Sequence, residues 1–252
     1  MSKETKKYRK TLESIFDQID ANNEESIVKA AGWMADAIER DELIHVVGSG
    51  GHSNMGAEEM LWRAGGLAPI DAMLDAGTNL IHGAKRSNII ERLPGYGVKI
   101  FDLYPCKTGE VIIIVNAYGI NSMTIDMCEE AHRRGMKVIA ITSKSFCQNV
   151  PKDAPSRHPS GKNLFEIADV FVDCCLPMGD AVIDIEGLDQ RVGATSTFCN
   201  AYCIQCLVIE TCRILAERGK DVPVWCSANA PGGDQKNKAM EEKYFPRVKH
   251  LR

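Results

Sequence analysis

A run of small and polar residues follows the apolar segment Leu43–Val47 and precedes a helical pattern that begins at Asn54. It reads Gly48-Ser49-Gly50-Gly51-His52-Ser53. Glycines let the backbone approach a ligand closely, and the free N–H groups at a helix start attract an anion. Ser49 or Ser53 could donate a hydrogen bond to a phosphate, although Ser53 could also serve only as a helix cap. Three glycines exceed what a cap requires, so the run favours a ligand site.

A dinucleotide site is a weaker interpretation of the same glycines. That fingerprint would place a glycine where Ser53 stands and an acidic residue about 20 positions further on. Asp71 lies near that distance, but a single acidic residue is a weak match. A nicotinamide cofactor is therefore not favoured.

A second junction of the same kind follows the β-branched run Glu110–Asn116. It continues Ala117-Tyr118-Gly119-Ile120-Asn121-Ser122 and leads into a helical pattern. Two such junctions in one sheet would place two sets of N–H donors on the same edge, where a small phosphorylated ligand could be held by both. The alternative is a polar turn in which Asn121 or Ser122 only caps the helix.

Acidic residues precede a third helix start, Thr195-Ser196-Thr197. They are Asp184, Glu186 and Asp189. A carboxylate beside a hydroxyl-rich helix start suits a base that moves a proton next to a phosphate. A solvated acidic connection capped by Thr195 is the alternative. A polar segment at 156–162, which includes His158, lies in a loop and is a further candidate for function.

Three cysteines, Cys199, Cys203 and Cys206, have a spacing that suggests an iron–sulfur cluster. They lie within a helical pattern, however, and spacings of four and seven place all three on one apolar stripe. We expect them to pack in the core as free thiols.

The elements that position these residues alternate between strand-like and helical patterns. The expected strands are Leu43–Val47, Leu67–Met73, Glu110–Asn116, Lys137–Thr142 and Ala168–Asp173. The expected helices are 54–64, 123–134 and 195–218, and residues 5–40 are predicted to form two helices separated at Asn22-Asn23. Continuous apolar strands indicate a parallel sheet covered on both faces. The predicted fold is a three-layer, doubly wound α/β sandwich, whose ligands bind beyond the carboxyl ends of the strands.

Composition excludes several classes of protein. The 252 residues carry 30 basic and 34 acidic side chains, a net charge of −4, and 44% are hydrophobic. That balance excludes a disordered chain and argues against a nucleic-acid binder. The charged start Met1–Lys7 has no apolar signal core, and apolar runs are too short for a membrane helix. Ten cysteines in apolar patterns favour a reduced, cytoplasmic protein.

Taken together, these segments resemble the SIS (sugar isomerase) domain family, and more closely a branch of single-domain SIS proteins. Four stretches carry the resemblance: GHSNMGAEEMLWRAGGLAP (51–69), SRHPSGKNLFEIAD (156–169), PMGDAVIDIEGLDQRVGATST (177–197) and SANAPGGDQKN (227–237). The resemblance implies a flavodoxin-like, five-stranded parallel sheet that binds phosphosugars at its carboxyl edge. It implies one domain over 1–252, with 1–40 as a helical extension and 41–252 as the α/β core.

The resemblance also implies roles for individual residues. Three loops would face the phosphate: Gly50, Gly51, His52 and Ser53; Asn116 to Asn121 with Gly119; and Thr195, Ser196 and Thr197. Glu186 or Asp189 falls near the position of the proton-transferring carboxylate. Two departures stand out: Asn116 and Tyr118 occupy places where the family usually has serines, and the first loop holds one extra residue.

The activity implied by the resemblance is aldose–ketose isomerisation of a sugar phosphate or amino-sugar phosphate. Glu186 or Asp189 would take the proton beside the carbonyl, and His52 or His158 would assist ring opening or proton return. Such acid–base help is worth ~10² to 10⁴ in rate. This chemistry requires no metal or other cofactor.

Two other functions stay open. The same base could drive β-elimination of water or an ether from an N-acetylhexosamine 6-phosphate, or the chain could be a sugar-phosphate sensor without catalysis. Residues 1–40 lack the basic recognition helix of SIS-containing transcriptional regulators. Because SIS domains usually pair, we expect a homodimer or homotetramer with the N-terminal helices as the contact.

Overall fold

Five short strands form one parallel sheet in the computed structural model, which describes all 252 residues. The strands are β1 Ile44–Gly48, β2 Ile70–Ala72, β3 Val111–Val115, β4 Lys137–Thr142 and β5 Val170–Asp173. Their order is β2-β1-β3-β4-β5, and every neighbouring pair is parallel. The predicted five-stranded α/β fold is confirmed. The strand order reverses between β1 and β3, which is where such sheets bind ligands.

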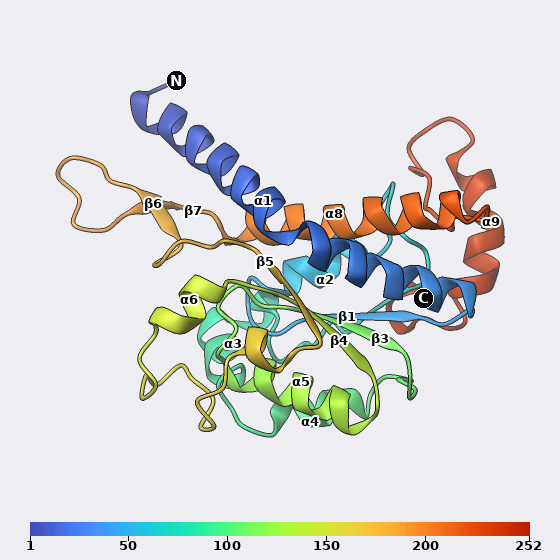
Figure 1. Cartoon of the computed structure of the whole chain (residues 1–252), viewed down its shortest axis with the longest axis horizontal. Helices are drawn as coiled ribbons and strands as arrows, with labels where there is room; N and C mark the ends of the chain where they lie inside the picture. The colour runs from blue at the N-terminus through green and yellow to red at the C-terminus, as the bar shows by residue number, and fades with distance from the viewer.

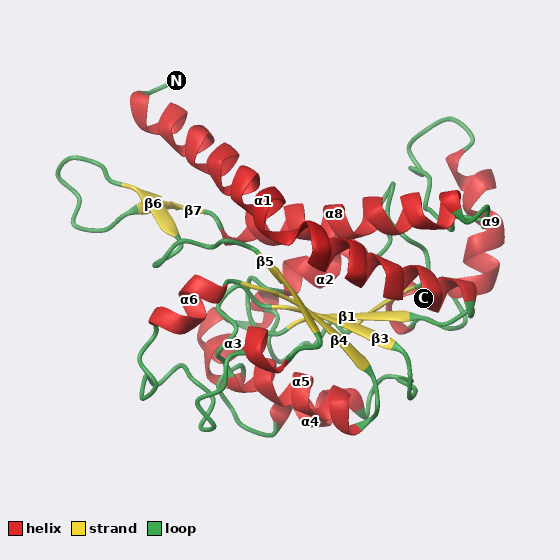
Figure 2. Ribbon diagram, in the orientation of Figure 1, coloured by secondary structure: helices red, strands yellow, loops and turns green.

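Helices cover both faces of the sheet (Figures 1 and 2). One face carries α1 Lys3–Glu39, α2 Asn54–Met60 and α8 Ser196–Glu217. The other carries α4 Tyr96–Phe101, α5 Ser122–Arg133 and α7 Leu164–Ile167. Within β3, Ile113 and Val115 pack into the first layer and Ile112 and Ile114 into the second. Burial on both faces explains why the strands are apolar without alternation.

The remaining elements lie around this sandwich. They are α3 Ala84–Ile90, α6 Lys144–Asn149, α9 Gly233–Tyr244, the 3₁₀ helices Leu80–His82 and Lys249–Leu251, and the strands β6 Ala181–Ile183 and β7 Val192–Ala194. Two elements are shorter than the sequence patterns predict, because α2 ends at Met60 and β2 spans only 70–72.

Residues 3–39 form one helix, so the predicted break at Asn22-Asn23 is wrong. Asn23 is 2% exposed and is bonded to β5 rather than to water. Its side-chain Nδ2 donates to the carbonyls of Ile19 and Asp173, at 2.7 and 3.0 Å. Its Oδ1 accepts from the backbone amide of Asp173 at 2.7 Å. A residue that disfavours helices locally is retained because it fixes α1 to the end of a strand.

β6 and β7 pair into an antiparallel hairpin that the sequence patterns did not predict. We call residues 181–194 the arm. The arm projects from the body beside the first turns of α1 (Figure 1). The Tyr8 hydroxyl donates to the Ala194 carbonyl at 2.5 Å and ties α1 to the base of the arm. Each strand is only three residues long, and the connecting residues 184–191 are exposed, so the sequence offers too short an apolar pattern to identify a strand.

α8 packs in the core beside α1. By length and composition alone it is the one helix that could cross a membrane. Ile204, Leu207 and Val208 pack into the first core layer, whereas Phe198 and Ile209 are exposed. Cys199 and Cys203 are fully buried in that core, which confirms the expected packing for these two thiols. Cys206 is only partly buried. All ten cysteines are free thiols.

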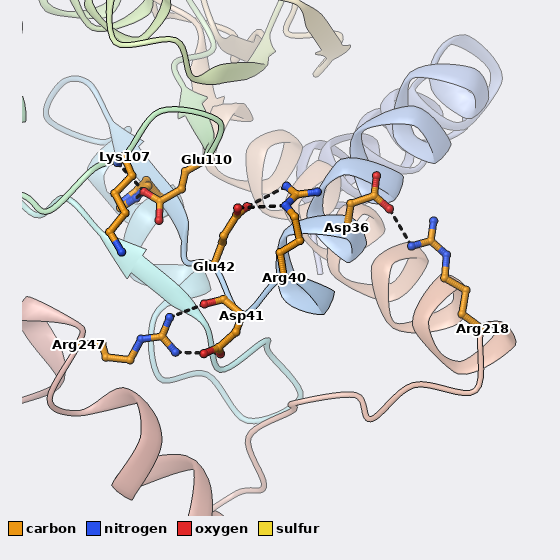
Figure 3. Close-up of polar contacts among 9 residues, drawn as sticks. Asp36, Arg40, Asp41, Glu42, Lys107, Glu110, Arg218 and Arg247 are labelled. Atoms are coloured by element: carbon orange, nitrogen blue, oxygen red, sulfur yellow. Dashed lines mark hydrogen bonds and ion pairs between the residues drawn. The ribbon is translucent and has the colours of Figure 1, made fainter.

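Charged side chains gather at the amino edge of the sheet, opposite the ligand-binding edge. In the interior, His45 is fully buried between two carboxylates, with Nδ1 3.1 Å from Asp71 Oδ2 and Nε2 2.9 Å from Glu110 Oε2. Burial opposes the charged imidazole, but the interactions with Asp71, Cys106 and Glu110 together outweigh it and raise the pKa of His45 well above its ordinary value. Nearer the surface, Figure 3 shows Asp36 paired with Arg218 and Arg40 with Glu42.

Candidate active site at the carboxyl edge of the sheet

A cavity of about 320 Å³ lies beyond the carboxyl ends of β1 and β3. Its wall is formed by residues from four segments, within 51–53, 80–91, 116–118 and 180–200. Two carboxylates line it, those of Glu91 and Asp180, together with His52 and several amides and hydroxyls. No Lys or Arg lines it. The cavity is therefore polar and acidic.

The loop after β1 is held in a tight turn by its glycines. A Cβ added at Gly48 would overlap the carbonyl of Ser53, and Gly50 has φ +137°, a conformation that favours glycine. The turn leaves the backbone amides of His52 and Ser53 without an acceptor in the chain. Of the residues predicted here, Gly51, His52 and Ser53 line the cavity. Gly50 lies behind them against Glu91.

Ser49 does not reach the cavity. It is fully buried, and its hydroxyl lies 2.6 Å from the Thr124 hydroxyl of α5. The hydroxyl therefore connects two elements below the loop, and the structure does not bring it to a ligand.

The loop after β3 is fixed by Asn116. Its Oδ1 accepts from the amides of Tyr118 and Gly119, at 3.1 and 2.9 Å, and its Nδ2 donates to the Ser49 carbonyl at 2.6 Å. Asn116 thus lines the cavity while it joins the first two loops. Tyr118 also lines the cavity, and its hydroxyl donates to Asp180 Oδ2 at 3.4 Å.

Gly119 and Asn121, also predicted to bind the ligand, do not line this cavity, although Asn121 lines an adjacent pocket together with Glu91 and Tyr118. Gly119 has φ +61°, and an added Cβ there would overlap the Thr142 hydroxyl of β4. The Asn121 side chain donates to the Ser156 carbonyl at 3.1 Å and so holds the 156–163 loop. Their polar and conformational features serve the fold.

The start of α8 forms a further part of the wall. Ser196 and Thr197 line the cavity, whereas Thr195 is fully buried beside it. The amides of Thr195 and Ser196 both donate to Asp180 Oδ1. The carboxylate beside this helix start is thus Asp180, and not one of the three acidic residues that the sequence patterns favoured.

The predicted base residues are not at the cavity. Glu186 and Asp189 are exposed in the loop that joins β6 to β7, and neither lines the wall. The arm carries them away from the body because a hairpin intervenes before α8 (Figure 1).

Glu91, which sequence reasoning missed, is the carboxylate that occupies the cavity wall beside the first loop. It follows α3, and its Oε2 accepts from the Gly51 amide at 3.4 Å. The Met123 amide at the start of α5 donates to the Glu91 carbonyl at 3.0 Å. Burial raises the pKa of Glu91, against the opposing hydrogen bond from Gly51. A half-buried carboxylate with a raised pKa is a candidate proton-transfer group.

The two candidate histidines have different environments. His52 lines the cavity. His158 lies outside it, with Nε2 3.3 Å from Asp126 Oδ1 and its backbone amide bonded to the Ile120 carbonyl. The structure therefore brings His52, and not His158, to the same cavity as Glu91.

The SIS domain family model matches residues 7–143, more than half of the chain. The chain belongs to the SIS domain family. A UPF0309 protein of Shouchella clausii is 34% identical over 245 residues, which cover 97% of this SIS chain and 98% of that relative. A UPF0309 protein of Caldanaerobacter subterraneus is 37% identical over 246 residues, which cover 95% of this chain and 98% of that relative.

Two solved structures share the fold of this SIS chain. A phosphoheptose isomerase from Neisseria gonorrhoeae superposes with a TM-score of 0.55 and 15% identity, covering 84% of this chain and 97% of that one. A phosphoheptose isomerase from Francisella tularensis superposes with a TM-score of 0.54 and 15% identity, and the match covers 84% of this chain and 98% of that one. At this identity the likeness concerns the fold.

Proposed function

We propose that this SIS protein binds a sugar phosphate in the cavity and interconverts its aldose and ketose forms, with Glu91 transferring the proton. The family, and the phosphoheptose isomerases that share its fold, support this class of ligand. The cavity volume of about 320 Å³ suits a small polar molecule. The observation that carries the proposal is the half-buried Glu91 carboxylate in the wall of that cavity.

The proton chemistry requires one base and one group that handles the oxygen. Glu91 removes the proton from the carbon beside the carbonyl and returns it to the neighbouring carbon, which exchanges the aldose and ketose positions. Burial favours the neutral carboxyl and makes Glu91 a stronger base than a solvated glutamate. His52, in the same wall, assists ring opening and moves the hydroxyl proton.

The phosphate would be held by neutral donors. The free amides of His52 and Ser53, with the hydroxyls of Ser53 and Thr197, lie in the wall near the starts of α2 and α8. Backbone amides at such a turn bind anions without a lysine or arginine.

The test is incubation of the protein with pentose, hexose, heptose and N-acetylhexosamine phosphates in D₂O, followed by NMR. We expect a ketose product and loss of the proton beside the carbonyl for at least one aldose phosphate. Glu91→Gln should lower kcat by ~10² to 10⁴ while ligand binding is retained. Glu186→Gln is the matched variant on the arm, and a loss confined to it would overturn the assignment of Glu91.

The other open functions give different results in the same experiment. An unsaturated product from an N-acetylhexosamine 6-phosphate would identify β-elimination in place of isomerisation. Thermal stabilisation by sugar phosphates without turnover of any of them would identify a sensor and overturn the proposal of an enzyme.

A further inference from the structure

The carboxylate of Asp180 occupies the amino end of α8, in the wall of the cavity. Its Oδ1 accepts from the backbone amides of Thr195 and Ser196, at 2.7 and 2.8 Å. Its Oδ2 accepts from the Ser196 hydroxyl at 2.9 Å, and the Thr195 hydroxyl donates to the Asp180 carbonyl at 3.1 Å. The positive end of a helix attracts anions, and here one of the chain's own side chains supplies the anion.

A turn at the base of the arm places this carboxylate. Asp180 has φ +62° and follows Gly179 at φ +85°, and its amide donates to the Pro177 carbonyl at 3.1 Å. A left-handed conformation is uncommon for a residue with a side chain. In this turn the Asp180 side chain is directed back onto α8.

Asn200 independently indicates that a ligand completes this part of the wall. It lies one turn after Ser196 on α8, lines the cavity and is 6% exposed. Its Oδ1 is buried and has no hydrogen-bond partner. A buried polar atom without a partner costs free energy, and a ligand hydroxyl or amine would satisfy it.

The charged side chains that line the cavity oppose the binding of an anionic ligand. Glu91 and Asp180 both line it, and no Lys or Arg does. A phosphate that enters therefore meets like charge, and it also meets a helix start whose first two free amides are already bonded to Asp180. Like charges brought together in a partly buried site oppose binding strongly.

We propose that Asp180 is a specificity-determining residue. Its carboxylate competes with the anionic group of the ligand for the backbone amides at the amino end of α8. A phosphate ion alone competes poorly with it. A sugar phosphate competes better, because its hydroxyls also donate to the Asn200 Oδ1. This inference rests on the proposed function only in taking the ligand to be an anionic sugar.

The test measures binding of inorganic phosphate by titration calorimetry at constant ionic strength. Asp180→Asn keeps the shape of the side chain and removes its charge, and we expect it to lower the Kd for phosphate at least about tenfold. Asp184→Asn makes the same change at an exposed position on the arm, and we expect it to change the Kd by less than about twofold. Asp180→Ser, which removes the charge with a shorter side chain, should show the same gain as Asp180→Asn.

The inference is overturned if neither Asp180 variant, folded by circular dichroism, binds phosphate more tightly than the parent protein. An equal gain in Asp184→Asn would also overturn it, because the effect would then be one of net charge. Phosphate binding does not require turnover, so the two proposals fail separately. Turnover of a sugar phosphate without the tighter binding contradicts only the role of Asp180, whereas tighter binding without turnover contradicts only the isomerase.

Discussion

Glu91 combines burial with a position in the cavity wall, and its pKa is raised above the ordinary value of 4.5. A base must be ionised to act, so a raised pKa moves the acidic limb of the pH–rate profile upward. We expect kcat/KM of the isomerase to fall with decreasing pH at a pH above 4.5. An acidic limb at or below the ordinary glutamate value, measured with any substrate that turns over, would contradict the assignment of Glu91.

The same raised pKa has a consequence for stability. Because the folded-state pKa exceeds the unfolded one, ionised Glu91 opposes folding at every pH above its unfolded value. We therefore expect Glu91→Gln to have an equal or higher Tm than the parent at pH 7, although its activity is lost. Scanning calorimetry of ligand-free protein checks this, and a clear fall in Tm would show that the ionised form stabilises the fold.

His45, at the opposite edge of the sheet, is a second residue whose ionisation matters. Replacing it with Gln leaves Asp71 and Glu110 as buried carboxylates without a cation, and we expect a loss of about 3–5 kcal/mol in the free energy of unfolding. The pKa of His45 is raised in the fold, so its contribution is complete below the unfolded pKa and is lost as the pH rises through the folded pKa. Denaturant titrations should show the difference between parent and variant shrinking at alkaline pH.

A matched control exists for His45. His132 pairs with Asp169 at 3.1 Å, but both side chains are more than a third exposed. His132→Gln should change the free energy of unfolding by less than about 1 kcal/mol. An equal loss in the two variants would mean that burial of the His45 pair is not the cause.

At the scale of elements, α1 is fixed to β5 by Asn23. Asn23→Ala removes three hydrogen bonds, including the one from the Asp173 amide, and we expect a loss of at least about 2 kcal/mol in the free energy of unfolding. The neighbouring Asn22 side chain is exposed and makes one hydrogen bond, from its Nδ2 to the Cys175 sulfur at 3.7 Å. Asn22→Ala should therefore change stability by less than about 0.5 kcal/mol. Equal effects in the two variants would contradict the role given to Asn23.

The sequence patterns predicted the sheet well because its strands are apolar on both faces. They also predicted the loop after β1, since Gly48 and Gly50 are required by a local turn. The Asn22-Asn23 pair was misread because the partner of Asn23 lies 150 residues away in β5. Glu91 could not be found for a similar reason, because no motif surrounds it and only the fold brings it to Gly51.

At the scale of the molecule, we propose that the protein forms a homodimer or homotetramer. The arm and the first turns of α1 project together from the body (Figure 1). Apolar side chains on the arm are exposed, with Leu188 at 56% and Val192 at 39%. Burial of such side chains against another copy would be favourable. Sedimentation velocity at micromolar concentration should show a dimer or tetramer, and a monomer alone would contradict this proposal.

The hydroxyl of Tyr8 contacts the Ala194 carbonyl, so the start of the chain is connected to the segment that carries Asp180. Expression vectors that trim the first ten residues would remove this tether while the sheet and both core layers stay intact. We expect the protein without residues 1–10 to fold and to bind its ligands with altered relative affinities. Screening for substrates is therefore best done with residues 1–10 present and any tag at the other terminus.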